Sequence, residues 1–176
     1  MHQGGGAAKT PEAWDVLLKQ GLVADNVNVV HGNDLSDDRL RRFVDLGVSF
    51  AVTAENEMSQ GHGHPIVGRL RDLKSEPALG VDLESSMSGD MMTQSRIALG
   101  HQRALDNAAS RARDGKIPDT STITTRAALG WITTEGARML RMQDRIGALG
   151  PGMQADLVML RADDLNLWCT MRFPPS

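Results

Sequence analysis

Short apolar runs alternate with longer amphipathic stretches along most of the chain. Apolar runs of about four to eight residues, bounded by glycine or polar residues, are typical of buried strands. They predict strands over residues 27–30, 48–53 and 78–82. The intervening stretches have apolar residues at helical spacing. They predict helices over residues 10–20, 35–46, 65–73, 89–113 and 124–140.

Capping and breaking residues mark several boundaries of these elements. Thr10 is a capping residue, Pro11 occupies the first helical position, and Gly21 ends the helix that they begin. Ser36 is the expected N-cap of the next helix, whose first turn is acidic. Residues 54–64 are polar and contain closely spaced glycines and histidines, which predicts a loop.

Strand and helix units that follow one another in this way predict an α/β fold with a parallel sheet and crossover helices. In such folds, functional side chains gather at the carboxyl ends of the strands, where the loops are free to vary. His31 directly follows one predicted strand, and Asp82 ends another. Two candidate ligands or proton carriers therefore lie at equivalent ends of two strands.

Composition narrows the class of protein. The chain has 176 residues, 40% hydrophobic and 23% charged, which is enough for one globular domain. It has no apolar run long enough to span a membrane and no secretory signal, and its single cysteine forms no internal disulfide, so we expect a cytoplasmic protein. A net charge of −3 with interleaved signs argues against nucleic acid as a partner.

Two segments near the end of the chain carry a family resemblance. Residues 133–137 read Thr-Thr-Glu-Gly-Ala, and residues 146–158 form a glycine turn and a predicted strand, Ile-Gly-Ala-Leu-Gly-Pro-Gly-Met-Gln-Ala-Asp-Leu-Val. Together they resemble the closing signature of the amidohydrolase superfamily, in its cytosine deaminase and chlorohydrolase-like branch. The resemblance implies the C-terminal half of a metal-dependent hydrolase TIM (β/α)8 barrel. Residues 1–145 would span the end of strand five through strand eight, and residues 146–176 would start a truncated β-sandwich return.

The same resemblance implies a divalent metal site for zinc or iron. His2 falls on the metal-binding histidine of the fifth barrel strand, and His31 on the sixth-strand histidine that contacts substrate and the reacting water. Asp82, in Gly80-Val81-Asp82, falls on the eighth-strand aspartate that binds metal and shuttles the proton. Catalytic roles are thus implied for His31 and Asp82. Substrate contacts are expected from Gln60, His62, Glu84 and Ser85.

Two departures from the family pattern bear on activity. The first-strand His-x-His pair of metal ligands has no counterpart, because His62-Gly63-His64 has the spacing but lies in the predicted loop. Gly5 stands where many deaminases of this branch place a glutamate. A catalytic zinc usually has about three protein ligands, so we expect the chain to be inactive alone.

The predicted function is therefore hydrolysis of a non-peptide C–N bond in a cyclic or heteroaromatic small molecule, of nucleobase or triazine type. The alternative is a catalytically dead half-barrel that acts as a binding or assembly module. A half-barrel exposes sheet edges, so we expect the chain to form a homo-oligomer or to associate with a missing N-terminal half.

Less specific interpretations of the same residues stay open. His31 has the alternative of capping the helix near Ser36, and Asp82 that of an N-cap for the following segment. His62 has the alternative of belonging to a mobile glycine-flanked loop. Charged loop residues such as Glu55, Glu57 and Glu84 are candidate substrate contacts, although most charges in loops are simply solvated.

Overall fold

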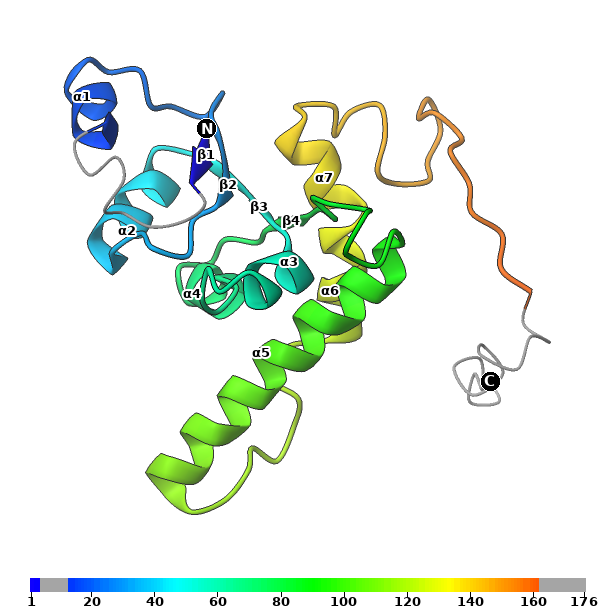
Figure 1. The fold of residues 1–176 in the computed structure, drawn as a ribbon. Helices are drawn as coiled ribbons and strands as arrows, with labels where there is room; N and C mark the ends of the chain where they lie inside the picture. The colour runs from blue at the N-terminus through cyan, green and yellow to red at the C-terminus, as the bar shows by residue number, and fades with distance from the viewer. Residues whose placement is uncertain (4–12, 162–176) are drawn as a thin grey trace.

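A computed structural model describes residues 1–3 and 13–161 and shows one parallel sheet. Its strands are β1 (His2–Gln3), β2 (Asn28–His31), β3 (Ser49–Val52) and β4 (Ala78–Leu79). They lie in the order β1-β2-β3-β4, so each strand pairs with the next one in the chain (Figure 1). The predicted α/β class with a parallel sheet is confirmed.

Helices connect and flank the strands. They are α1 (Ala13–Lys19), α2 (Asp37–Asp45), α3 (Ala54–Ser59), α4 (Val67–Asp72), α5 (Met91–Asp114), α6 (Thr125–Trp131) and α7 (Thr134–Met139). The last three pack against one another beside β4, whereas α1 and α2 lie near β1 and β2 (Figure 1). Among the described residues no helix is both long and apolar enough to cross a membrane.

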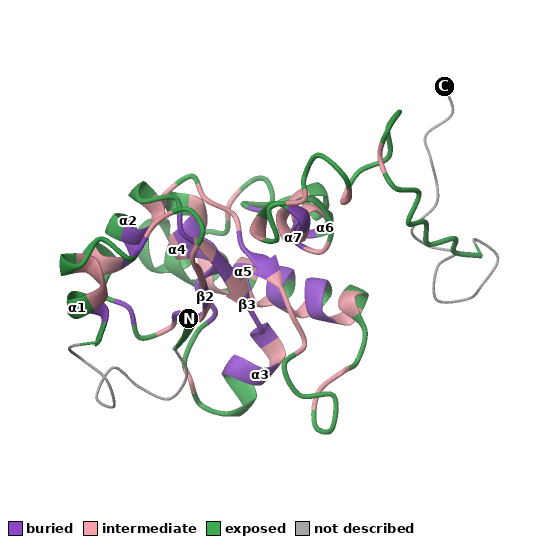
Figure 2. Ribbon diagram, turned by 90° about the horizontal axis from the view of Figure 1, so that it is seen from above, coloured by how far each residue is buried: buried purple, intermediate pink, exposed green. Residues whose placement is uncertain are grey.

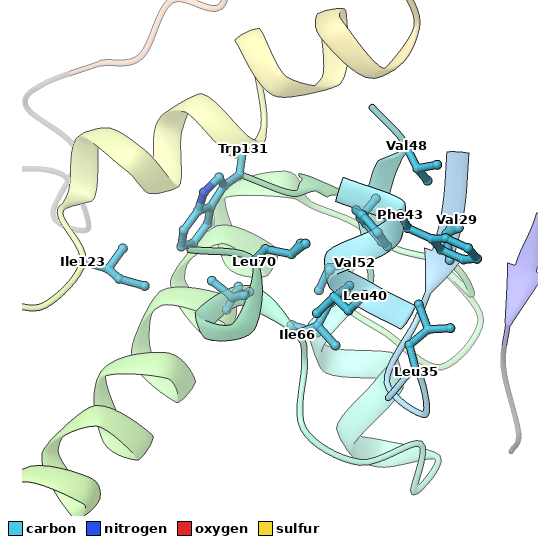
Figure 3. Packing of buried hydrophobic residues seen from close by; sticks show 14 of the residues in the cluster. Val29, Leu35, Leu40, Phe43, Val48, Val52, Ile66, Leu70, Ile123 and Trp131 are labelled. Carbon is cyan, nitrogen blue, oxygen red and sulfur yellow. The ribbon is translucent and has the colours of Figure 1, made fainter. Parts of the chain in front are cut away.

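The core lies between the two central strands and the helices that cover them (Figure 2). Residues of β2 and β3 alternate between buried and partly exposed positions, as expected for strands with one face fully covered. Val29, Phe50 and Val52 meet Phe43 of α2 and Leu70 of α4, all at most 1% exposed (Figure 3). Apolar burial of this kind is the main source of stability of such a domain.

Local capping agrees with the sequence where side chains contact the helix backbone. Ser36 caps α2 as predicted, accepting a hydrogen bond from the Arg39 backbone N–H at 3.3 Å. Asp90 caps α5 in the same way through the Thr93 N–H at 2.7 Å. Gly115, with φ of 70°, ends α5 in the left-handed conformation that glycine adopts without strain. Thr10 and Pro11 lie outside the described residues.

The predicted loop over residues 54–64 was wrong in its first half, because residues 54–59 form α3. Apart from Ala54 in its first turn, the buried residues of this helix are polar, with Asn56 1% and Glu57 0% exposed. A helix whose buried face is polar has no apolar periodicity, so the sequence pattern did not reveal it.

The predicted continuous helix over residues 124–140 was also wrong. It breaks between α6 and α7, where Thr133 has φ −134° and ψ −89°, outside the helical region. The strand expected after the glycine turn of residues 146–152 is absent from the described residues as well. Residues 154–161 are exposed and pair with no strand, and Figure 1 shows them leading away from the sheet.

The two signature segments nevertheless contact each other. Gly147 has φ of 89°, and a Cβ added there would lie 2.6 Å from the Cβ of Ala137 and 3.1 Å from the Thr133 carbonyl oxygen. Only glycine fits this close approach. The Ile-Gly turn is thus packed directly against α7, which is the physical reason that both segments occur together.

Candidate metal centre

His2 and His31 stand on neighbouring parallel strands and meet at the same edge of the sheet. The register pairs His2 with Val30 and Gln3 with His31. The two imidazoles lie edge to face, with ring centroids 4.7 Å apart and Nε2 atoms 3.1 Å apart. The expected meeting of these two histidines therefore occurs, and their Nε2 atoms face one another.

Asp82 approaches the same point from the loop after β4. Its Oδ2 atom lies 3.7 Å from His31 Nε2 and accepts a hydrogen bond from the Asn56 side chain. The strand predicted to end at Asp82 is shorter than expected, because β4 ends at Leu79. The chain leaves the sheet first and then turns back at Asp82, where φ is 74°.

The backbone of the two central residues is held in an uncommon conformation. His31 has φ of 70° and Asp82 has φ of 74°, both in the left-handed region that non-glycine residues rarely adopt. Such conformations cost about 1–3 kcal/mol each and cluster at functional sites. Their presence at the two residues whose side chains converge marks this edge of the sheet as the candidate site.

A buried carboxylate supports His31 from behind. His31 is 1% exposed, and its Nδ1 atom lies 3.2 Å from Glu57 Oε1 and 3.1 Å from Thr53 Oγ1. Glu57 is itself completely buried and accepts the Thr53 backbone N–H at 2.9 Å. Glu57 therefore lies beneath the site. The interpretation of this residue as a loop charge that touches substrate does not hold.

The donor atoms present fit part of a zinc site. His2 Nε2 and Asp82 Oδ2, the donor atoms of the two expected metal ligands, lie 3.1 Å and 3.7 Å from His31 Nε2, so both reach the same point at the edge of the sheet. Nδ1 of His31 is occupied by a carboxylate, an arrangement typical of metal-binding histidines. Within residues 1–3 and 13–161, no group of three or more histidine, cysteine, aspartate or glutamate side chains is arranged so that it could hold a metal ion. The donor atoms present therefore make an incomplete metal centre.

The predicted substrate contacts divide into two groups. Gln60 donates to Asn56 Oδ1 at 2.7 Å, and the His62 ring lies 5.3 Å from the His31 ring, so both lie near the centre. The Nδ1 atom of His62 is buried without a partner among the described residues. Glu84 and Ser85 are exposed in the turn after Asp82, and no contact between the described residues joins them to His31.

A second histidine pair lies beside this loop. His64 Nδ1 and His101 Nε2 are 3.0 Å apart, and their rings stack at 5.1 Å. Burial lowers the pKa of His101, the nearby His64 lowers it further, and Glu57 opposes both. Asn33 connects the two pairs, since its side-chain N–H group donates to Glu57 Oε2 at 3.1 Å and to the His64 carbonyl at 3.0 Å.

Sequence reasoning missed Thr53 and Asn56 behind the centre and gave Glu57 a different role. Thr53, Asn56 and Glu57 belong to one short stretch that begins directly after β3. Its one recognisable signal is position, because polar residues directly after a buried parallel strand lie at the functional edge of a sheet.

A comparison with known families identifies the family of the chain. The amidohydrolase family model matches residues 3–172. The chain belongs to the amidohydrolase family.

Curated relatives at low identity are deaminases. The chain is 31% identical over 153 residues to an 8-oxoguanine deaminase from Pseudomonas aeruginosa, covering 86% of this chain and 31% of the relative. It is 26% identical over 167 residues to a 5-methylthioadenosine/S-adenosylhomocysteine deaminase from Desulfitobacterium hafniense, covering 94% of this chain and 35% of the relative. The chain thus spans about a third of the length of these proteins.

Solved structures share the arrangement of elements. An adenosine deaminase from Xanthomonas campestris with bound zinc superposes with a TM-score of 0.71 at 26% identity, covering 92% of this chain and 35% of that one. A zinc complex of atrazine chlorohydrolase from Arthrobacter aurescens has a TM-score of 0.72 at 22% identity, covering 86% and 32%. The second likeness concerns the fold alone.

Proposed function

We propose that this chain supplies the His2, His31 and Asp82 side of a metal-dependent hydrolase that acts on non-peptide C–N bonds of a heteroaromatic small molecule. The observation that carries the proposal is the convergence of these side chains at one edge of a parallel sheet. Family membership and deaminase relatives support the reaction class. Nucleobase-like or triazine-like compounds are the proposed substrates.

Zinc or iron is the proposed cofactor, held here by His2 and Asp82. When bound, such an ion supplies the Lewis acidity that makes water a nucleophile near neutral pH. Asp82 is suited to accept a proton, because Asn56 holds its Oδ2 atom and its side chain is 29% exposed. His31 orients the attacked centre through Nε2. Gln60 and His62 are proposed to line the substrate pocket, with Glu84 and Ser85 at its rim.

The fold assignment beyond the parallel sheet is also a proposal. The four strands would be strands five to eight of a (β/α)8 barrel, with residues after 145 returning toward a small β-sandwich. The strands β1 and β4 form the two edges of the sheet and are two residues long. A second copy of the chain or an N-terminal half-barrel would pair with them, and the chain alone would be inactive.

Fragment complementation tests the proposed reaction. The part of the Pseudomonas aeruginosa 8-oxoguanine deaminase outside its 153 matched residues is supplied as a separate chain with zinc. Ammonia release is then measured from 8-oxoguanine, guanine and an aminotriazine. We expect release by the mixture, none by either chain alone, and at least ~100-fold less with Asp82→Asn.

Glu55→Gln is the matched control in this assay. Glu55 was a candidate substrate contact in the sequence, but its carboxylate on α3 accepts hydrogen bonds from Ser88 and Gln94 and touches neither histidine of the centre. The proposal fails if the mixture releases no ammonia while the intact relative does. It also fails if Asp82→Asn is as active as the unchanged chain. Normal activity of Glu55→Gln with loss in Asp82→Asn supports it.

A further inference from the structure

We propose that Glu57 is a positioning residue that holds the proton of His31 at Nδ1 and leaves Nε2 with a free lone pair toward His2 and Asp82. The inference rests on the proposed function, because the tautomer determines whether His31 Nε2 acts as an acceptor or as a donor at the proposed site. The contacts that define the tautomer do not depend on the reaction.

The atoms around His31 Nδ1 define the tautomer. Glu57 Oε1 lies 3.2 Å from Nδ1, and Thr53 Oγ1 lies 3.1 Å from it. An ionised carboxylate only accepts hydrogen bonds. A bare Nδ1 would place its lone pair against that carboxylate in a buried setting, where like electron density repels strongly. The proton therefore belongs on Nδ1, with both oxygens as acceptors.

The other side-chain contacts of Glu57 come from N–H donors, so both of its oxygens act as acceptors. The Thr53 backbone N–H donates to Oε1 at 2.9 Å, and the Asn33 side chain donates to Oε2 at 3.1 Å. Glu57 is 0% exposed and lies on α3, which begins directly after β3. A buried charge is stable only when its lone pairs are satisfied. The Glu57 carboxylate has three such partners, namely His31, Thr53 and Asn33.

The orientation of Nε2 follows from the occupied Nδ1. Nε2 of His31 lies 3.1 Å from His2 Nε2 and 3.7 Å from Asp82 Oδ2. With no proton of its own, Nε2 directs its lone pair toward this edge of the sheet. His31 is thus an acceptor or ligand at this edge of the sheet, and it becomes a donor only after it takes up a second proton.

Nuclear magnetic resonance of the whole chain tests the tautomer without metal or substrate. Histidine labelled with ¹⁵N gives distinct long-range proton–nitrogen patterns for the two neutral tautomers. The chain has five histidines, and His31→Gln assigns the His31 signals by their loss. At pH 8 we expect His31 with a protonated Nδ1 and a bare Nε2.

Substitutions separate the role of the carboxylate from that of its neighbours. Glu57→Leu removes the acceptor beside Nδ1 at similar size, so we expect the protonated-Nδ1 form of His31 to fall from nearly all molecules to a minority. Glu55→Gln, on the same helix, and Thr53→Val leave the tautomer unchanged.

The wild-type spectrum tests the inference even where Glu57→Leu does not fold. A His31 with a bare Nδ1 overturns the inference, and so does a folded Glu57→Leu chain with an unchanged His31 tautomer. These results are separate from the fate of the proposed reaction. The tautomer holds or fails in metal-free protein, whereas the reaction is tested by ammonia release.

Discussion

Two histidine pairs in the described part of the chain have nearly the same nitrogen–nitrogen distance but different surroundings. His2 and His31 are 3.1 Å apart, with a buried carboxylate behind His31 and Asp82 in front. His64 and His101 are 3.0 Å apart and stacked. His64 is exposed, and Nδ1 of His101 is buried without a partner.

The difference shows that proximity of two imidazoles does not by itself make a site. At the first pair, contacts of Glu57 and Thr53 with His31 Nδ1 leave Nε2 of that ring facing His2. Asp82 adds a third potential metal-donor atom. At His64 and His101, no carboxylate orients either ring among the described residues, and burial disfavours the charged form of His101. Metal binding is therefore predicted for the first pair only.

The largest expected effect is on metal affinity. Replacing His2 and Asp82 together by alanine removes two of the three converging donors, so we expect zinc affinity to fall more than ~100-fold, about 2.7 kcal/mol. Competition against a chromogenic chelator measures this. His64→Ala with His101→Ala is the matched double variant and leaves affinity unchanged. The predicted difference between the two pairs is contradicted if the His64 and His101 double variant loses zinc while the His2 and Asp82 double variant retains it.

A smaller effect is expected from the carboxylate behind the site. Glu57→Gln leaves all three donors in place but weakens the orientation of His31, so we expect zinc affinity to fall about 10–100-fold. The same chelator competition measures it, with Glu55→Gln as control. If Glu57→Gln and the unchanged protein bind zinc with equal affinity, the buried carboxylate does not contribute to zinc binding at His2 and His31.

Asn33 joins the two pairs, and its removal tests that link. Asn33→Ala withdraws one donor group from both Glu57 Oε2 and the His64 carbonyl. We expect the free energy of unfolding to fall by about 1–3 kcal/mol, measured by urea denaturation. Asn107→Ala, at an exposed position of α5, should stay within about 0.5 kcal/mol of the unchanged protein. A loss no larger than that control would mean that the link adds nothing.

The smallest effect is a pH dependence from the second pair. Burial first, and then the nearby His64, lower the pKa of His101 below its usual value of about 6.5. The unfolded chain then binds a proton that the folded chain resists. This contribution to stability is present above pH 6.5 and declines as the pH falls. Thermal melts between pH 5 and pH 7.5 should show a smaller decline in His101→Gln, and an equal or larger decline would contradict the assignment.

Much of the fold was predictable because it has simple local causes. The apolar runs that form β2 and β3 match the observed strands within a residue or two, and Ser36 caps α2 by the expected contact. Repeated strand and helix units predicted parallel pairing, which the sheet shows. These features depend on neighbours in sequence, and residue types report such neighbours directly.

The errors arose where the deciding contacts are distant or polar. Helix α3 was missed because two of its three buried residues, Asn56 and Glu57, are polar. The break at Thr133 was missed because the residues on both sides of it have helical spacing. A strand was expected after the glycine turn and up to residue 160, but residues 154–160 form none in the described part of the chain.

By itself the sequence determined the class of fold, the family signature and the positions of His2, His31 and Asp82 near strand ends. Only the tertiary structure decided which atoms of those residues face one another and what lies behind them. Glu57 illustrates the reason. In sequence it is one acidic residue of a polar stretch, and its role depends on a burial and a 3.2 Å contact with a residue 26 positions away. Side-chain burial and orientation follow from packing across the whole domain, and no local pattern encodes them.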